Sequence, residues 1–504
     1  MMRYGFIIDH RKCIGCHACT VACKSENNVP IGAFRTWVKY IEKGQFPNTR
    51  RYFNVLRCNH CDNAPCIRIC PVTALFRRPN GIVDFDPEQC IGCKACMQAC
   101  PYDALYINPY TNTAEKCNFC AHRVEVGLEP ACVIVCPVQA IIAGDLDNPD
   151  SHISSLLGRQ EVHVRKPEQG TLPKLFYIRA EESGITPDAC SRPDFFMWSE
   201  KMAELNTVAF QEEMEKKART VYDISHDRPW GWKVSAYLWT KSISSGAFLI
   251  PALLSGLGIV SGIFNLEIFG AITGLVFLAI TGLLLIFDLK RPERFYRILT
   301  RPQWRSWLTI GAYIITGYGL VISLWLAVAT MGWGALSDGL SWAGAVLAAL
   351  TAIYSGFLFG QAEGRDLWQS PVMAVHLLVQ ALVAGAAVLL VASPAIGMSA
   401  QAYSIISKML VGSLILNIFI ILAGEILTPH TSADAKRAIQ LITRGPFKML
   451  FWGGAIVAGS LIPILLLLIG QAEGYAIVAS LLSLAGLLAF EHVWIMAGQA
   501  APLS

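Results

Sequence analysis

Sixteen of the 17 cysteines fall into four groups of four near the start of the chain. The first and third groups have the spacing C-x2-C-x2-C-x3-C, which holds [4Fe–4S] clusters. In that spacing three close thiolates bind one cluster, and the fourth cysteine reaches a neighbouring cluster. We therefore predict iron–sulfur clusters held by four cysteine groups, which are Cys13, Cys16, Cys19, Cys23; Cys58, Cys61, Cys66, Cys70; Cys90, Cys93, Cys96, Cys100; and Cys117, Cys120, Cys132, Cys136.

Other uses of these cysteines fit the spacing less well. Zinc sites take paired C-x2-C motifs with four ligands for each ion, and the C-x2-C-x2-C-x3-C run differs from that arrangement. Disulfide frameworks belong to short secreted chains, and we expect no secretory signal at the start of this sequence. Cys190 stands apart from the four groups, and we interpret it as a bystander thiol.

Sixteen ligands suffice for four [4Fe–4S] clusters. One or two clusters would serve a local redox step, whereas four predict electron transfer across a domain. The sequence around the cysteines contains glycines and prolines such as Gly15, Gly92, Pro71 and Pro101. This composition favours short strands and loops arranged around the clusters.

The four-group pattern resembles the electron-transfer subunit of molybdopterin oxidoreductases, such as dimethyl sulfoxide reductase, polysulfide reductase and formate-dependent nitrite reductase. The resemblance covers about residues 1–190, in the segments CIGCHACTVACK, CNHCDNAPCIRICPVTAL, CIGCKACMQACPYDAL and KCNFCAHRVEVGLEPACVIVCP. It implies a ferredoxin-like α+β domain that docks on a separate molybdopterin-containing subunit. It also implies four ligand sets, which are Cys13, Cys16, Cys19 with Cys136; Cys117, Cys120, Cys132 with Cys23; Cys58, Cys61, Cys66 with Cys100; and Cys90, Cys93, Cys96 with Cys70.

The two halves of the chain differ in composition. Residues 1–230 hold 27 Lys or Arg and 27 Asp or Glu, whereas residues 231–504 hold 14 and 10. Soluble domains carry about 25% charged residues, so we predict a soluble cluster domain at 1–195, a linker or surface helix at 196–229 and a membrane domain at 230–504. The net charge of +4 arises in the apolar half. No basic block with interleaved aromatic residues occurs, so we expect no nucleic-acid partner.

Eight apolar segments follow the linker, each close to the roughly 20 residues that a spanning helix needs. We therefore predict an all-α integral membrane domain of eight helices, at about 234–260, 266–287, 306–330, 341–361, 371–392, 403–427, 448–470 and 474–497. Basic residues gather in the loops on the side of the N-terminus, including six between 290 and 305. The positive-inside rule then places both termini and the cluster domain on the cytoplasmic side of the inner membrane.

The membrane half also repeats itself at an offset of 138–139 residues. YLWTKSISSGAFLI at 237–250 aligns with HLLVQALVAGAAVL at 376–389, and GQA recurs at 360–362 and 498–500. Two four-helix bundles related as a parallel repeat are therefore predicted. The segments DLKRPERFYRILTRPQWRSWLTIGAY and AGQAAPLS resemble the quinone-reacting membrane subunit of the polysulfide reductase family. No histidine pair faces across spans at a similar depth, so we expect no haem.

Ionisable side chains inside a membrane are costly and mark functional sites. Most lie near the predicted cytoplasmic ends, where menaquinone or ubiquinone would exchange electrons with a cluster and protons with these groups. The candidates for quinone binding and proton relay are Tyr237, Lys241, Asp288, Arg291, Tyr354, Glu363, His376, Glu425, Glu491 and His492. Structural pairing within Asp288–Arg291 and within Glu491–His492 stays open, as does core packing of the two tyrosines.

These patterns predict an electron-transfer and membrane-anchor subunit of a respiratory oxidoreductase. It would link membrane quinone to a molybdopterin-containing catalytic subunit through four [4Fe–4S] clusters, with substrate chemistry on the partner. Three alternatives stay open. The same clusters could serve a hydrogenase or formate dehydrogenase, the chain could be a membrane-tethered ferredoxin, or the second bundle could pump ions through His376, Glu425 and His492.

Overall fold

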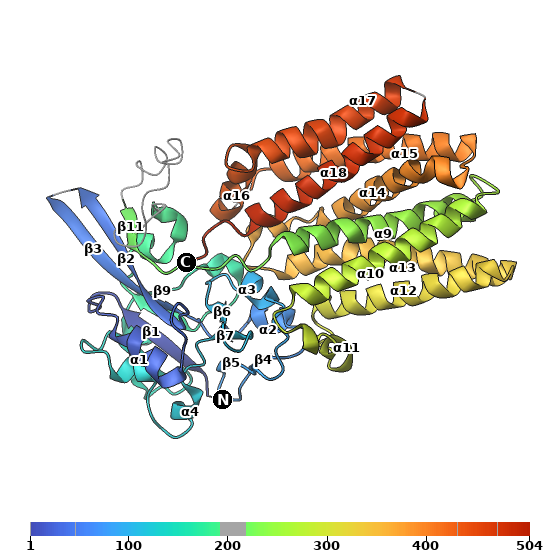
Figure 1. Cartoon of the computed structure of the whole chain (residues 1–504). Helices are drawn as coiled ribbons and strands as arrows, with labels where there is room; N and C mark the ends of the chain where they lie inside the picture. The colour runs from blue at the N-terminus through green and yellow to red at the C-terminus, as the bar shows by residue number, and fades with distance from the viewer. Residues whose placement is uncertain (1, 46, 192–217, 431, 471) are drawn as a thin grey trace. The chain divides into compact units, whose positions relative to one another are not determined.

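The structure is a computed structural model that describes residues 2–45, 47–191, 218–430, 432–470 and 472–504 (Figure 1). The chain divides into two compact units, Met1–Pro229 with Pro502–Ser504, and Trp230–Ala501. The sequence interpretation placed the last three residues in the membrane domain. They pack in the first unit instead, where the Leu503 carbonyl accepts a hydrogen bond from Arg165 at 2.8 Å and Ser504 Oγ lies 2.9 Å from His226 Nε2.

A four-stranded sheet with the order β8-β1-β10-β9 forms one core of the first unit. Strand β1 (Tyr4–Asp9) runs parallel to β10 (Leu175–Ile178) and antiparallel to β8 (Ile141–Asp145), and β9 (Val162–His163) adds an edge. Alternate β1 residues face α6 (His152–Arg159), so that Ile7, Ile153 and Ile178 form a buried cluster. Ser151 caps α6 by accepting a hydrogen bond from the Ser154 backbone.

A second sheet has the order β11-β2-β3. Strands β2 (Thr36–Gln45) and β3 (Asn48–Arg57) form a long antiparallel hairpin, and β11 (Ala218–Tyr222) pairs with β2. The hairpin is exposed at its tip and buried where β3 ends. Most of the predicted linker at 196–229 lies outside the described residues, and its described part contains β11 rather than a helix.

The remaining elements of the first unit are short and lie among the cysteine groups. They include the hairpins β4 (Leu75–Arg77) with β5 (Val83–Phe85) and β6 (Leu105–Ile107) with β7 (Ala114–Lys116). The helices are α1 (Ala18–Asn27), α2 (Pro65–Ile69), α3 (Ala95–Ala99), α4 (Ala121–Val124), α5 (Ala131–Ile134), η1 (Pro167–Gln169), α7 (Glu182–Ile185) and η2 (Pro187–Ala189).

The second unit consists of long helices with short helical connections (Figure 1). The long helices are α9 (Trp232–Gly256), α10 (Phe264–Asp288), α12 (Trp307–Thr330), α13 (Gly334–Gln361), α14 (Met373–Ile396), α15 (Ala400–Phe419) with the π-helix η5 (Ile420–Ile426), the π-helix η6 (Met449–Leu461) with α17 (Ile462–Ile469), and α18 (Glu473–Gly498). The connections contain η3 (Pro292–Arg294), α11 (Arg297–Thr300), η4 (Asp366–Gln369) and α16 (Ala433–Thr443).

Seven helices in the described part of this unit are long and apolar enough to cross a membrane. They coincide with the second to eighth predicted segments. Helix α9 coincides with the first, but it does not reach the same apolarity and is absent from the seven. Its polar residues include Lys241 and several serines, which are buried inside the unit.

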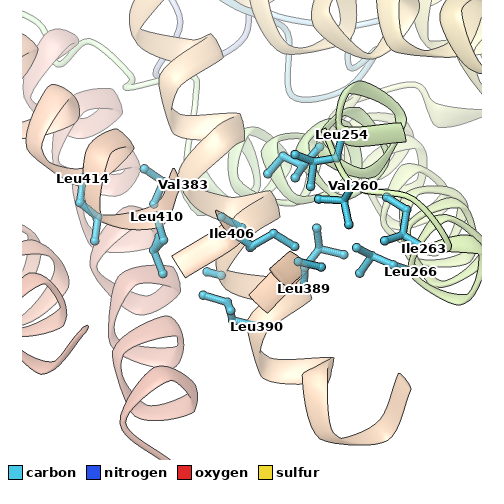
Figure 2. Packing of buried hydrophobic residues seen from close by; sticks show 14 residues of the cluster. Leu254, Val260, Ile263, Leu266, Val383, Leu389, Leu390, Ile406, Leu410 and Leu414 are labelled. Atoms are coloured by element: carbon cyan, nitrogen blue, oxygen red, sulfur yellow. The ribbon is translucent and has the colours of Figure 1, made fainter. Parts of the chain in front are cut away.

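Helices α9 and α14 cross at the centre of the unit, where Gly246 and Gly385 are in contact. A side-chain carbon at either glycine would clash with the backbone of the other helix. Beyond the crossing, apolar residues from α9, the connection that follows it, the start of α10, α14 and α15 form a buried cluster (Figure 2). The labelled members of this cluster are Leu254, Val260, Ile263, Leu266, Val383, Leu389, Leu390, Ile406, Leu410 and Leu414.

Candidate functional site

All four cysteine groups share one loop conformation. The residue two positions after the first cysteine has a positive φ in every group, at Gly15, His60, Gly92 and Phe119. The backbone N–H of that residue points to the sulfur of the first cysteine, at 3.4 to 3.5 Å in the last three groups. Glycine suits this left-handed turn, and N–H donors stabilise the thiolate form of a cysteine.

Two cavities in the first unit are each lined by four cysteines. Cys23, Cys117, Cys120 and Cys132 line one cavity. Cys70, Cys90, Cys93 and Cys96 line the other, where the Gly92 and Ala114 N–H groups donate to Cys90 Sγ at 3.4 Å. Each cavity therefore joins one cysteine of one group to three of another.

The other eight cysteines also gather in two sets, as their electrostatic interactions indicate. The Cys13 thiol interacts with Cys16 and Cys136, and Cys19 interacts with both Cys132 and Cys13. In the same way, the Cys61 and Cys66 thiols both interact with Cys58 and Cys100. The two four-cysteine cavities coincide with two of the sets that the family resemblance implied, and the other two sets stay a prediction.

The four sets follow one another in space. Cys19 of the first set interacts with Cys132 of the second. Cys117 of the second set interacts with Cys58 of the third. Cys66 of the third set interacts with Cys96 of the fourth. These interactions give the order Cys13 set, Cys23 set, Cys58 set and Cys70 set.

The donor chemistry of these sets fits iron–sulfur clusters. Burial raises the pKa of the Cys19 and Cys100 thiols to about 11, so such thiols ionise when a metal supplies the compensating charge. Across the described residues, no three His, Cys, Asp or Glu side chains converge closely enough to hold a single metal ion. Each set supplies the four cysteine thiolates that a [4Fe–4S] cluster would require.

Two polar residues beside the second set were missed by the sequence analysis. Arg57 Nη1 donates to Cys132 Sγ at 3.0 Å, and the Asn27 amide lies 3.8 Å from Cys23 Sγ and 3.7 Å from Cys120 Sγ. Arg57 directly precedes the second cysteine group, and Asn27 follows Cys23 by one helical turn. Both positions could have been noticed from this spacing. Cys190 lies elsewhere and donates to the Ser183 carbonyl at 2.8 Å.

In the second unit, α9, α13 and α18 bring several of the predicted quinone-site residues together. Lys241 of α9 is fully buried, and its Nζ donates to the Ala352 carbonyl at 2.9 Å and to Ser355 Oγ at 2.8 Å. It also interacts electrostatically with buried Glu491 of α18, whose Oε1 has no hydrogen-bond partner. A buried cation normally needs such partners.

The two predicted tyrosines belong to the same group. The Lys241 ammonium lies 5.0 Å from the centre of the Tyr354 ring. The side chains of Tyr354 and Ser355 are hydrogen-bonded to each other. Tyr237, one turn before Lys241 on α9, also bonds to Ser355 and interacts with Glu491. Tyr237, Lys241, Tyr354, Ser355 and Glu491 are called the Lys241 site below. Ser355 was not predicted.

The other candidates lie in separate places within this unit. His376 Nε2 is 3.1 Å from Asn417 Oδ1 and 3.4 Å from Gln380 Nε2, between α14 and α15. Glu425 lies in the π-helix η5, where its Oε1 accepts a hydrogen bond from Ser370 at 2.9 Å.

Four candidates lie nearer the ends of helices. Arg291 pairs with Glu293 at 3.1 Å, and Asp288 ends α10 and interacts electrostatically with Tyr237. Glu363 and His492 are half-buried.

Comparison with known proteins identifies the family. The polysulphide reductase NrfD family matches residues 220–502, which is more than half of the sequence. This protein belongs to that family. A 4Fe-4S dicluster domain matches residues 49–146. The resemblance and the iron–sulfur chemistry inferred from the sequence are thereby confirmed.

Similar curated proteins are subunits of reductases. The chain is 48% identical over 203 residues to the tetrathionate reductase B subunit of Salmonella typhimurium, covering 39% of this chain and 80% of the relative. It is 42% identical over 188 residues to the polysulfide reductase B subunit of Wolinella succinogenes. This match covers 36% of this chain and 97% of the relative. It is 46% identical over 177 residues to the thiosulfate reductase electron transfer subunit PhsB of Salmonella typhi. This match covers 34% of this chain and 91% of the relative.

The chain is therefore an iron–sulfur electron-transfer subunit of an oxidoreductase, joined to a membrane domain with several spans. The fold agrees with the prediction in its coarse form, because a ferredoxin-type cluster domain precedes a helical membrane domain.

Proposed function

We propose that the chain carries electrons between membrane quinone and a molybdopterin-containing catalytic subunit through four [4Fe–4S] clusters. The observation that carries this proposal is the linear order of four cysteine sets in one compact unit. A single cluster pair would serve local chemistry, whereas a linear series suits transfer over a distance. When bound, each cluster supplies one-electron redox chemistry.

The cysteine sets assign ligands to the four clusters. The first takes Cys13, Cys16, Cys19 and Cys136, and the second takes Cys23, Cys117, Cys120 and Cys132. The third takes Cys58, Cys61, Cys66 and Cys100, and the fourth takes Cys70, Cys90, Cys93 and Cys96. The two four-cysteine cavities support the second and fourth assignments.

The catalytic partner docks at the first set. Cys16 is exposed, and Cys13 and Cys136 are half-buried, whereas most other cysteines are buried. Exposed apolar side chains stand beside these cysteines in the sequence, at Ile14, Val21, Ile134 and Val135. Apolar groups around an accessible redox centre suit a protein interface in which electrons pass directly.

The membrane domain has eight spans in two four-helix bundles. Helix α9 adds an eighth span to the seven apolar helices. Its 25 residues suffice for a crossing, and its polar side chains face inward. The chain leaves the first unit at Pro229 and returns to it at Pro502, which supports an even number of crossings. The basic loop at 290–305 supports a cytoplasmic position for the cluster domain at the inner membrane.

The quinone reacts at the Lys241 site. Reduction of a quinone takes two electrons and two protons, so its oxygens need nearby donors. Lys241 holds a positive charge in a fixed position. Glu491 Oε1 is a buried carboxylate oxygen without a hydrogen-bond partner, and it can exchange a proton with the quinone. Buried ionisable groups of this kind are retained in membranes for function.

Metal analysis and quinol reduction test this proposal on the purified full chain. We expect about 16 iron and 16 sulfide per chain, and cluster reduction by a menaquinol analogue in detergent. Chains with half that iron would contradict the four-cluster assignment. Absence of quinol-dependent reduction with full iron content would contradict the quinone reaction.

A pair of lysine variants locates the quinone site. Lys241→Met is expected to slow quinol-dependent cluster reduction at least tenfold, because it removes the charge beside Tyr354 and Glu491. Lys408→Met is the matched control, since Lys408 is a lysine on the exposed face of α15. Equal rates in the two variants, at equal iron content, would place the quinone elsewhere.

A further inference from the structure

Arg57 is a fully buried cation beside the second cysteine set. It is the last residue of β3, with an exposed fraction of 0%. Its Nη1 donates to Cys132 Sγ at 3.0 Å, and its guanidinium carbon lies 4.6 Å from the centre of the Phe6 ring. Both Arg57 and Phe6 line the cavity formed by this set.

The remaining donors of Arg57 lack partners. Its Nε and Nη2 are buried without a hydrogen bond, and within the described residues no carboxylate pairs with it. Arg35, another buried arginine of this unit, pairs with Glu115 at 2.9 Å. Unpaired buried charge is costly, so the free donors of Arg57 point to an anion in the cavity. A thiolate-bound cluster is such an anion.

We propose that Arg57 raises the reduction potential of the cluster bound by Cys23, Cys117, Cys120 and Cys132. This cluster is then among the positions of the relay that accept electrons first. This inference rests on the ligand sets of the proposed function. Reduction adds one negative charge to the cluster, and a fixed cation at a ligand sulfur stabilises the added charge. The low dielectric of the interior strengthens the effect.

The electron balance of the step needs no proton. With clusters bound, the electron gained at the Cys23 set would be the one lost at a neighbouring set, so no further oxidant or reductant would be needed. Arg57 keeps its proton throughout, because an arginine stays charged in proteins. It also interacts electrostatically with Cys19 of the adjoining set, so its charge acts where two sets of the relay meet.

Redox titration of the full chain, followed by electron paramagnetic resonance, tests this role. We expect Arg57→Gln to lower one of the four midpoint potentials by at least 59 mV, which is a tenfold change for one electron. Arg57→Lys retains the charge and should shift the same signal by less than half as much. Arg165→Gln is the control, because Arg165 is equally buried but donates to the Leu503 carbonyl.

Four unchanged midpoints in Arg57→Gln, at full iron content, would overturn the inference and leave the proposed function standing. A wild-type chain without cluster signals would overturn both. If Arg57→Gln loses its iron, Asn27→Asp identifies the cluster, because it places a carboxylate beside Cys23 and Cys120. Asn27→Asp should lower the midpoint potential of one cluster signal. In a titration of the wild type, that signal should be among the first two to be reduced. If it is reduced third or fourth, the inference is overturned.

Discussion

Buried charges in the two units are held in different ways. Arg57 faces a cysteine sulfur and an aromatic ring, whereas Lys241 faces a backbone carbonyl and a serine hydroxyl. Burying a charge is costly unless it is paired. Arg57 therefore lies beside a cysteine of the proposed electron transfer. Lys241 lies in the site of the proposed proton transfer.

His10 makes the cluster domain sensitive to acid. It is half-buried against Tyr177, with 5.1 Å between ring centres, and desolvation lowers its pKa from 6.5 to about 4. The unfolded protein binds a proton between these values and the folded protein does not, so stability falls as the pH drops through this window. At pH 5 the loss is about 2 kcal/mol.

Thermal unfolding at pH 7.5 and pH 5, followed by cluster absorbance in detergent, measures this loss. We expect the unfolding temperature to fall with pH in the wild type and to fall less in His10→Phe. His152→Gln is the control, since His152 is exposed and should behave as the wild type does. An equal fall in His10→Phe and the wild type would contradict the assignment.

At the level of elements, the crossing of α9 and α14 depends on two glycines. Gly385→Ala should destabilise the membrane unit by about 1–3 kcal/mol, because the added carbon meets the backbone of Gly246. Gly412→Ala on α15 meets nothing within 4 Å and should be neutral or slightly stabilising. Size-exclusion chromatography after heating measures both, and equal behaviour of the two variants would show that close packing is not limiting.

Spacing along the chain predicted some elements and missed others. The positions of the long apolar helices followed from length and hydropathy, because lipid requires both. The π-helices η5 and η6 were not predicted, since the extra residue per turn depends on packing rather than on composition. Strand β11 was also missed, because its pairing with β2 joins residues about 180 positions apart.

The same limit applies to the site. The sixteen cysteines were recognisable from local spacing, but their arrangement in sets came from a family resemblance. Lys241 and Glu491 meet through tertiary packing of helices 250 positions apart, which no local pattern reveals. Arg57 contacts Cys132, which lies 75 positions further along the chain. The position of Arg57 beside a cysteine group is visible in the sequence, but its contact with Cys132 forms only in the fold.

For the whole molecule, cysteine labelling distinguishes eight spans from seven. Asp150→Cys marks the cluster domain, Ser261→Cys the loop after α9 and Arg301→Cys the basic loop, and all three positions are exposed. With α9 as a span, a membrane-impermeant maleimide should label only Ser261→Cys on intact cells. Labelling of Asp150→Cys together with Ser261→Cys would show that α9 does not cross.

The contact between Gly246 and Gly385 has an evolutionary consequence. The two glycines occupy equivalent positions in the predicted repeat. A side-chain carbon at Gly385 would meet Gly246, and one at Gly246 would meet Gly385 and the Ala381 carbonyl. Self-contact of equivalent positions is the property of a residue on a two-fold axis. A single ancestral four-helix chain would therefore have carried a self-complementary surface at this glycine. The predicted repeat would then hold, in one polypeptide, two copies of a chain able to pair as a homodimer.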